Sequence, residues 1–292
     1  MGLGLLVGTS VVNHLTWLPL IIAMIFFFVI GLVEDLHGIP ILARLVLQLG
    51  VSALVSALLV LSGPQPLLAP LLVVIISTVW ITGFANAFNF MDGINGISGA
   101  HAVLGGLAFV VIGKLSRDPS LLVVAAIVVA AGLAFLPWNA VNAKVFLGDV
   151  GSYTLGAVLA VLVVYSVLRG VPVEAALAPL SLYLADTGWT LGRRILRKTT
   201  WLQPHREHAY QRLCDAGWAH HQVTALTFGV GVVVSLLGAV SLGGDLYLRV
   251  AADGLAIAIL VCYLAAPRLL AGRPAPVVPI QELGEIDDCS RS

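Results

Sequence analysis

Long apolar runs separated by short polar clusters dominate the chain. No Asp, Glu, Lys or Arg occurs before Glu34, and none lies between Leu45 and Met91. A bilayer core of roughly 30 Å is crossed by about 20 apolar helical residues, so these runs predict membrane-spanning helices. Nine complete spans are expected, at residues 15–33, 45–61, 67–88, 97–113, 120–136, 153–168, 175–189, 223–242 and 246–266.

The opening residues 1–12 are also apolar, but they lack the basic residues of a signal peptide. As a helix they would extend only about 18 Å, so we expect the second half of a membrane helix and about ten transmembrane helices in total. The pattern therefore predicts an all-α, polytopic integral-membrane helical bundle. We expect residues 1–292 to form a single domain, with residues 267–292 as a cytoplasmic tail.

The composition narrows the class of protein further. Hydrophobic residues make up 59% of the chain and charged residues 10%, with a mean hydropathy of +1.02. Soluble domains carry about 25% charged residues, so a soluble enzyme and a disordered chain are excluded. The 15 basic residues balance 15 acidic ones, which leaves no net positive charge for nucleic acid. Three widely separated cysteines form no metal-binding or disulfide pattern.

The basic residues are shared unequally between the two sets of connections. One set holds eleven Lys or Arg residues and the other holds four, and the positive-inside rule places the richer set in the cytoplasm. We therefore expect a multi-pass protein of the cell (inner) membrane. The cytoplasmic set comprises residues 34–44, 86–96, 138–150, 193–220 and the tail after 267.

Two acidic motifs lie at span ends on this face. Glu34 and Asp35 end the first complete span, and adjacent carboxylates in apolar surroundings can hold a cation or act as a base. Asp149 lies between Gly148 and Gly151 at the start of another span, where helix N–H groups favour anions. A solvated helix end for the acidic pair and a simple capping role for Asp149 remain alternatives.

A third motif ends the span before residue 92. Asn86 and Asn89 are spaced i,i+3 on one helix face, and Asp92 follows before two glycines break the chain. Amides and a carboxylate at a membrane helix end are costly unless they have partners. This motif therefore indicates a binding site, with a polar helix end meeting water as the alternative.

The longest connection on this face is basic and contains histidines. His205, Arg206 and His208 suit phosphate oxygens better than zinc, because no Cys pair is nearby. A positive-inside loop with incidental histidines is the alternative. Asp186, near the end of the preceding span, has Arg193 seven residues on, which favours a helix-end ion pair over catalysis.

Hard oxygen ligands and basic side chains thus gather on one predicted face. Mg²⁺ held by carboxylates and substrate phosphates fits this combination, with Mn²⁺ as the alternative metal. Phosphoryl transfer depends on charge neutralisation and in-line positioning. A secondary transporter would place its polar residues near the membrane midplane, where this sequence has few.

The polar motifs occur in a recognisable order. They read GLVEDLHGIPILARL, NAFNFMDGINGISG, PWNAVNAKVFLGDVGSYTLG and DTGWTLGRRILRKTTWLQPHREHAYQRL. Together they resemble the polyprenyl-phosphate N-acetylhexosamine-1-phosphate transferase family, which includes phospho-N-acetylmuramoyl-pentapeptide transferase. The resemblance covers residues 31–213, and its last motif looks most like the branch that starts O-antigen or similar glycans.

The resemblance implies a Mg²⁺-dependent exchange between two substrates. Polyprenyl phosphate attacks the β-phosphorus of a UDP-N-acetylhexosamine, and UMP leaves. The membrane and this lipid are then partners, and a homodimer is compatible with the family. By family pattern Asp149 and Asp92 hold the metal, and Asn139 and Phe146 line the uracil site. The implied catalytic residues are Glu34, Asp35, Asp92 and Asp149, and the implied substrate-binding residues are Asn86, Asn89, Asn95, Asn139, Lys144, Phe146, His205, Arg206 and His208.

The chain departs from the family pattern at three motif positions. Glu34 and Asn95 stand where the family usually has Asp, and Asn142 stands where it usually has Pro. These departures leave open a catalytically weakened homologue that acts as a binding or assembly subunit. The family's opening helix and its Pro/Arg/Gly-rich first cytoplasmic loop have no counterpart here, so we expect a longer natural gene product that supplies both.

Overall fold

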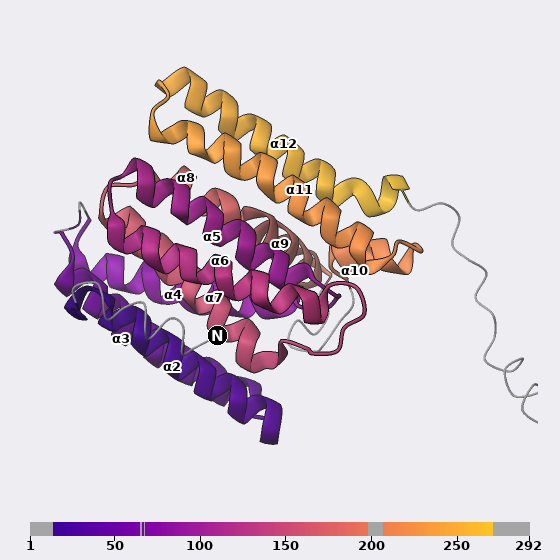
Figure 1. Cartoon of the computed structure of the whole chain (residues 1–292), viewed down its shortest axis with the longest axis horizontal. Helices are drawn as coiled ribbons and strands as arrows, with labels where there is room; N and C mark the ends of the chain where they lie inside the picture. The colour runs from indigo at the N-terminus through magenta and orange to yellow at the C-terminus, as the bar shows by residue number, and fades with distance from the viewer. Residues whose placement is uncertain (1–13, 65, 67, 198–206, 271–292) are drawn as a thin grey trace, which may run out of the picture.

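The computed structural model describes residues 14–64, 66, 68–197 and 207–270, and every regular element within these ranges is helical (Figure 1). The elements are α2 (His14–His37), α3 (Ile41–Ser62), α4 (Pro70–Met91), α5 (Ile97–Leu115), α6 (Pro119–Asn139), α7 (Gly148–Leu168), α8 (Val173–Leu177), the 3₁₀ turn η1 (Ala178–Leu180), α9 (Ser181–Leu196), α10 (Ala209–Asp215), α11 (His220–Ala239), the 3₁₀ turn η2 (Val240–Leu242) and α12 (Leu246–Leu270).

Eight of the described helices are long and apolar enough to cross a membrane. They are α2 to α7, α11 with η2, and α12. The expected all-α, polytopic membrane bundle is therefore confirmed, and the chain is a multi-pass membrane protein. The partial helix expected at residues 1–12 lies outside the described residues.

The single span expected at residues 175–189 is wrong in its form. The structure divides this stretch into α8, η1 and the first part of α9. Pro179 lies inside η1 and has no backbone N–H to donate to the carbonyl four residues before it, which favours a break in the α-helix at this point. The broken stretch brings Asp186 to a buried position in α9.

Helix α7 occupies the centre of the bundle. It packs against α2 and α4 and also contacts α3, α5 and α8. Its residues are buried on every side, as expected for a helix whose sequence is apolar all round. In Figure 1, α2 and α3 flank the bundle on one side and α11 and α12 on the other. Helices α2 and α3, at the start of the chain, thus pack against α7, which is encoded in the middle of the chain.

Small residues allow the helices around α7 to approach closely. A Cβ at Gly31 of α2 would lie 2.5 Å from the carbonyl oxygen of Asp149, and a Cβ at Gly156 of α7 would lie 2.8 Å from the Cα of Ala85 in α4. Glycine is therefore required at both crossings, as is common where membrane helices pack. The crossing at Gly31 places the end of α2 directly against the start of α7.

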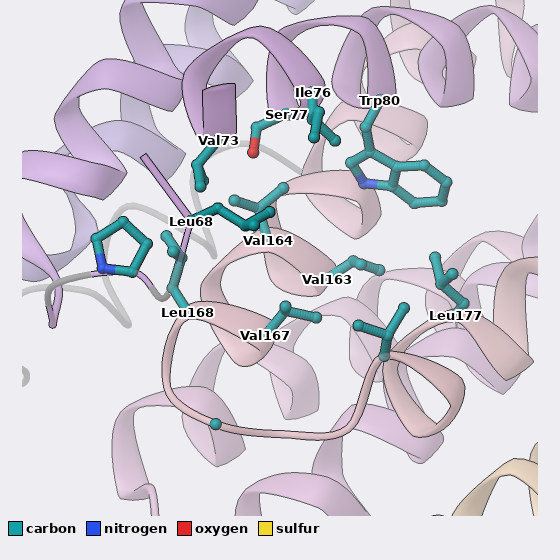
Figure 2. A pocket seen from close by; sticks show the side chains of 13 residues that line it. Leu68, Val73, Ile76, Ser77, Trp80, Val163, Val164, Val167, Leu168 and Leu177 are labelled. Carbon is teal, nitrogen blue, oxygen red and sulfur yellow. The ribbon is translucent and has the colours of Figure 1, made fainter. Parts of the chain in front are cut away.

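The predicted polar connections do meet on one face of the bundle. Hydrogen bonds described below join the ends of α2 and α4 to the start of α7. They also join the loop after α4 to the end of α6 and the start of α11. At the opposite end, an apolar cavity of about 470 Å³ lies between α4, α7 and α8 (Figure 2). Its lining includes Trp80, Val164 and Leu168, and it is separate from the polar motifs.

Candidate active site

The acidic pair at the end of α2 is held by two different sets of donors. Asp35 Oδ1 and Oδ2 accept hydrogen bonds from the backbone N–H groups of Asp149 and Val150, each at 3.0 Å. Glu34 Oε1 pairs with Arg44 Nη1 at 2.7 Å, and Glu34 Oε2 accepts from Ile39 N at 2.8 Å. Asp35 therefore caps α7 from a neighbouring helix, whereas Glu34 fixes the turn into α3.

The backbone of Gly148 makes the contact with Asp35 possible. Gly148 has a φ of +66°, a conformation that favours glycine, and a Cβ there would lie 2.6 Å from Asp35 Oδ2. The motif glycine thus lets the start of α7 turn its N–H groups toward α2. A carboxylate at a helix N-terminus is also favoured by the helix dipole.

Asn89 connects α4 to the carboxylate of Asp149. Its Nδ2 donates to Asp149 Oδ1 at 2.7 Å and to Ser152 Oγ at 2.9 Å. Asn86, one turn earlier, donates instead to Gln48 Oε1 of α3 at 2.7 Å. The two amides expected on one helix face therefore bind different helices: Asn86 contacts α3, and only Asn89 contacts Asp149 in α7.

Asp92 ends α4 beside this group. Its backbone N–H donates to Asn89 O at 3.1 Å. Burial raises the pKa of the Asp92 carboxyl to about 6, and the negative charge of Asp149 contributes to the increase. The structure thus brings together Asp35, Asn89, Asp92 and Asp149, of which the first and last are 114 residues apart in the sequence.

Asn139 connects two loops at the rim of this site. Its Oδ1 accepts from Gly96 N at 2.7 Å, and its Nδ2 donates to Val145 O at 2.9 Å. Lys144 and Phe146 lie in the second of these loops, and both side chains are exposed. Asn139 is itself buried, so its amide organises the loops that present Lys144 and Phe146.

Helix α11 holds the loop after α4 from the other side. Thr224 Oγ1 donates to Asn95 O at 2.9 Å, and Asn95 N donates to His220 Nδ1 at 3.4 Å. The backbone of Asn95, rather than its side chain, carries these contacts. The loop that follows Asp92 is therefore fixed by both α6 and α11.

The histidine motif is described only in part. His205 and Arg206 lie outside the described residues, whereas His208 is buried and contacts Asp186 through Nδ1 at 3.2 Å. The ion pair expected between Asp186 and Arg193 is wrong, because Arg193 pairs with Glu207 at 3.2 Å. Glu207 pairs with Arg193 and Arg194 at the end of α9. Asp186 instead accepts a hydrogen bond from the start of α10.

Several residues that complete the site escaped sequence reasoning. Gln48, Ser152 and Tyr263 lie in membrane-spanning helices and Tyr210 lies in α10, and their contacts appear only in the folded chain. Ser152 had a signal, since it lies three residues after Asp149 in the glycine motif. Tyr210 lies within the last quoted motif, whereas Gln48 and Tyr263 had no signal, because their partners are at least 38 residues away.

The donor set fits a magnesium ion. Asp92 and Asp149 offer hard carboxylate oxygens close enough for one charge to raise the pKa of the other acid, and a cation would relieve that repulsion. Mg²⁺ usually takes one or two carboxylates and completes its shell with substrate phosphates and water. The described residues contain no cluster of three or more His, Cys, Asp or Glu that could hold a metal by themselves.

The fold and this site define a membrane-embedded bundle with a cluster of carboxylates at one end, and comparison with known families agrees with that class. The family described as glycosyl transferase family 4 matches residues 17–167, which is more than half of the chain. The chain therefore belongs to glycosyl transferase family 4. The matched region includes α2 to α7 and every carboxylate of the site.

Individual relatives point to two kinds of protein. A probable undecaprenyl-phosphate N-acetylglucosaminyl 1-phosphate transferase of Bacillus subtilis is 26% identical over 218 residues, covering 71% of this chain and 61% of the relative. A phospho-N-acetylmuramoyl-pentapeptide-transferase of Streptococcus mutans is 33% identical over 171 residues, covering 54% of this chain and 50% of the relative. The chain thus spans between half and two thirds of the length of these relatives.

Proposed function

We propose that the chain transfers an N-acetylhexosamine 1-phosphate from a UDP-sugar to polyprenyl phosphate, releasing UMP, at the start of O-antigen or related envelope-glycan synthesis. The observation that carries the proposal is the convergence of Asp35, Asn89 and Asp92 on Asp149 at one end of the bundle. Membership of glycosyl transferase family 4 and the printed activities of the two relatives support it.

The acidic residues take the central roles in this reaction. Asp149 and Asp92 would hold Mg²⁺, and its charge would stabilise the diphosphate in the transition state. Asn89 fixes the Asp149 carboxylate by its hydrogen bond. Asp35 and Glu34 organise charge around the lipid phosphate and take its proton where one is present. One oxygen of that phosphate bonds to the β-phosphorus, the bond to the bridging oxygen breaks, and UMP leaves with the electron pair.

The rim residues bind the remaining parts of the substrates. Phe146 is 75% exposed, so its ring is available to stack on uracil, with Asn139 shaping the loop beneath it. Lys144 lies in the same loop and offers a cation to the nucleotide phosphates. In this proposal Asn86 and Asn95 support the nucleotide region, and His205, Arg206 and His208 bind the diphosphate or the sugar.

The transfer reaction can be tested directly. The protein in lipid nanodiscs would be incubated with Mg²⁺, undecaprenyl phosphate and, separately, UDP-N-acetylglucosamine, UDP-N-acetylgalactosamine and UDP-N-acetylmuramoyl-pentapeptide. We expect UMP release and a lipid-diphosphate sugar with one of these donors, and neither product with Asp149→Asn. Absence of product with every donor, together with absence of UMP exchange into each donor, contradicts the proposal and favours a binding or assembly subunit.

The orientation of the site can be tested independently. We propose that the acidic face is cytoplasmic, where UDP-sugars are available, as the eleven basic residues against four indicate. In a cysteine-free background, Ala219→Cys would report this face and Ser116→Cys the opposite one, because both positions are exposed. A membrane-impermeant thiol reagent on intact cells should label Ser116→Cys alone. Labelling of Ala219→Cys alone would reverse the orientation.

A further inference from the structure

A buried carboxylate connects three helices behind the acidic site. Asp186 of α9 is 0% exposed and accepts hydrogen bonds from Ala209 N at 2.9 Å and from Tyr263 OH at 3.0 Å. His208 Nδ1 lies 3.2 Å from Asp186 Oδ1, and Tyr210 N donates to Oδ2 at 3.4 Å. The donors belong to the start of α10 and to α12, so one side chain joins α9, α10 and α12.

The start of α10 depends on this carboxylate. A helix of seven residues has little stability by itself, and its first N–H groups need acceptors. Asp186 supplies an acceptor from another helix, and Gln211 Oε1 accepts from His208 N at 3.2 Å. Asp186 therefore anchors the start of α10 from another helix, in addition to the cap that Gln211 supplies from within α10.

Helix α10 in turn contacts the segment that carries Asp92. Tyr210 OH donates to Phe90 O at 3.0 Å. The same hydroxyl lies so close to Gly93 that a Cβ there would overlap with it. Phe90 and Gly93 flank Asp92 in the chain, so the Tyr210 hydroxyl holds the backbone on both sides of this carboxylate.

We propose that Asp186 is a positioning residue, which holds Asp92 in place through α10 and the hydroxyl of Tyr210. Asp186 does not touch the substrates. It holds α10 in place, and α10 holds the segment that carries Asp92. Tyr263 makes α12 part of the same device, although α12 lies beyond the region matched by the family. The expected effect on activity rests on the proposed function, whereas the expected effect on the backbone does not.

The first experiment measures the backbone by amide hydrogen exchange in nanodiscs. Tyr210→Phe removes one hydroxyl and keeps the ring, and loss of a buried hydrogen bond should speed exchange at residues 92–98 by about tenfold. Asp186→Asn and Tyr263→Phe should speed exchange at 92–98 and at 208–213. The matched control is Tyr165→Phe, which also removes a hydroxyl that donates to an Asp carboxylate at 3.0 Å, at the opposite end of the bundle.

The second experiment measures the Mg²⁺ concentration that gives half-maximal transfer. Displacement of Asp92 should raise this concentration by about tenfold in Tyr210→Phe, a coupling of usual size, while the KM for the UDP-sugar changes less. Tyr165→Phe should change neither value. Because Asp186 and Tyr210 act in series, the effect of Asp186→Asn with Tyr210→Phe should be smaller than the product of the single effects.

The outcomes separate this proposal from the proposed function. If exchange at 92–98 in Tyr210→Phe and Tyr263→Phe equals that in Tyr165→Phe, the positioning role is wrong, whatever the activity. If exchange rises as expected but the wild-type protein transfers no sugar phosphate, the positioning role stands and the proposed function fails. The two Tyr→Phe variants carry the test if Asp186→Asn does not fold.

Discussion

The carboxylates at the two ends of α7 have different kinds of partner. At the far end Asp118 receives a hydrogen bond from Tyr165 OH at 3.0 Å and lies 3.8 Å from Arg169 Nε, and the Arg169 guanidinium stacks 3.6 Å above the Tyr165 ring. At the start of α7, Asp149 has an amide donor, Asn89, at 2.7 Å. The first arrangement neutralises a charge, whereas the second only orients one.

The difference indicates which end has a binding function. Of the four carboxylates at the acidic end, only Glu34 has a basic partner among the described residues, and that partner is Arg44. Ionised groups without a counter-charge are costly in a membrane protein and are retained for function. The acidic end is therefore where the proposed Mg²⁺ would bind, whereas the carboxylate at the far end already has a basic partner.

The strongest test of this comparison exchanges one carboxylate at each end. Asp149→Asn should lower the transfer rate by on the order of a thousandfold, because loss of metal charge stabilisation costs several kcal/mol. Asp118→Asn should leave the rate within about twofold. Turnover assays on both variants, with thermal unfolding as the check on folding, decide the matter. A rate for Asp149→Asn above about a tenth of wild type would contradict the assigned role.

The acidic pair offers a smaller contrast within one end. Asp35→Asn loses one of the two acceptors for the N–H groups of α7 and the charge at the helix N-terminus, so we expect a rate about 30-fold lower. Glu34→Gln keeps an acceptor for Ile39 N and should retain measurable activity. A steady-state assay of both variants checks the order. If Glu34→Gln is inactive while Asp35→Asn is near wild type, the two roles are reversed.

The pH dependence of metal binding follows from the raised pKa of Asp92. With a pKa of about 6, the Asp92 carboxyl is protonated at pH 5 and ionised at pH 7.5. The half-saturating Mg²⁺ concentration should therefore be about tenfold higher at pH 5 than at pH 7.5. Asp92→Asn should bind Mg²⁺ weakly at both pH values. A wild-type Mg²⁺ titration that does not change between them would remove Asp92 from the metal site.

The same pKa shift has a consequence for stability in the absence of metal. Because the folded state holds the Asp92 proton more tightly than the unfolded state, the stability from this group is full below about pH 4 and declines as the pH rises through about 6. Thermal unfolding without Mg²⁺ should show this decline in the wild type and lack its Asp92 component in Asp92→Asn.

The smallest effect is expected at the far end. Arg249 pairs with Glu174, and both side chains are about one third exposed. Exposed pairs contribute about 0–1 kcal/mol, so Glu174→Gln should lower the melting temperature only slightly and leave transfer unchanged. Differential scanning fluorimetry and the same transfer assay measure both. A large loss of activity would show that the far end is not merely structural.

The membrane spans could be predicted from the sequence because they depend on local composition. The apolar runs identify the eight long helices, and the alternation of connections groups the polar motifs on one face. Pro179 was visible too, but the apolar residues around it concealed the break between α8 and α9. Helix α10 is only seven residues long and produces no periodic signal.

The contacts of the site could be predicted only in part. Motif residues such as Asn89 and Asp149 stand out because polar groups are rare in membrane helices. Their partners depend on helix crossings, which the sequence does not encode locally. The bond from Asp149 N to Asp35 exists because Gly31 lets α2 touch α7. Asp186 contacts α10 and Arg193 pairs with Glu207, and neither contact is encoded by the spacing of Asp186 and Arg193.

The glycine crossings also separate a rigid part of the site from a part that tolerates substitution. At Gly31 and Gly156 the backbones of neighbouring helices pack directly against each other. A side chain at either position would clash, so α2, α4 and α7 form a rigid frame. The loop with Lys144 and Phe146 projects from this frame with exposed side chains. A library that seeks a new donor nucleotide should therefore randomise residues 140–147 and leave the two glycines untouched.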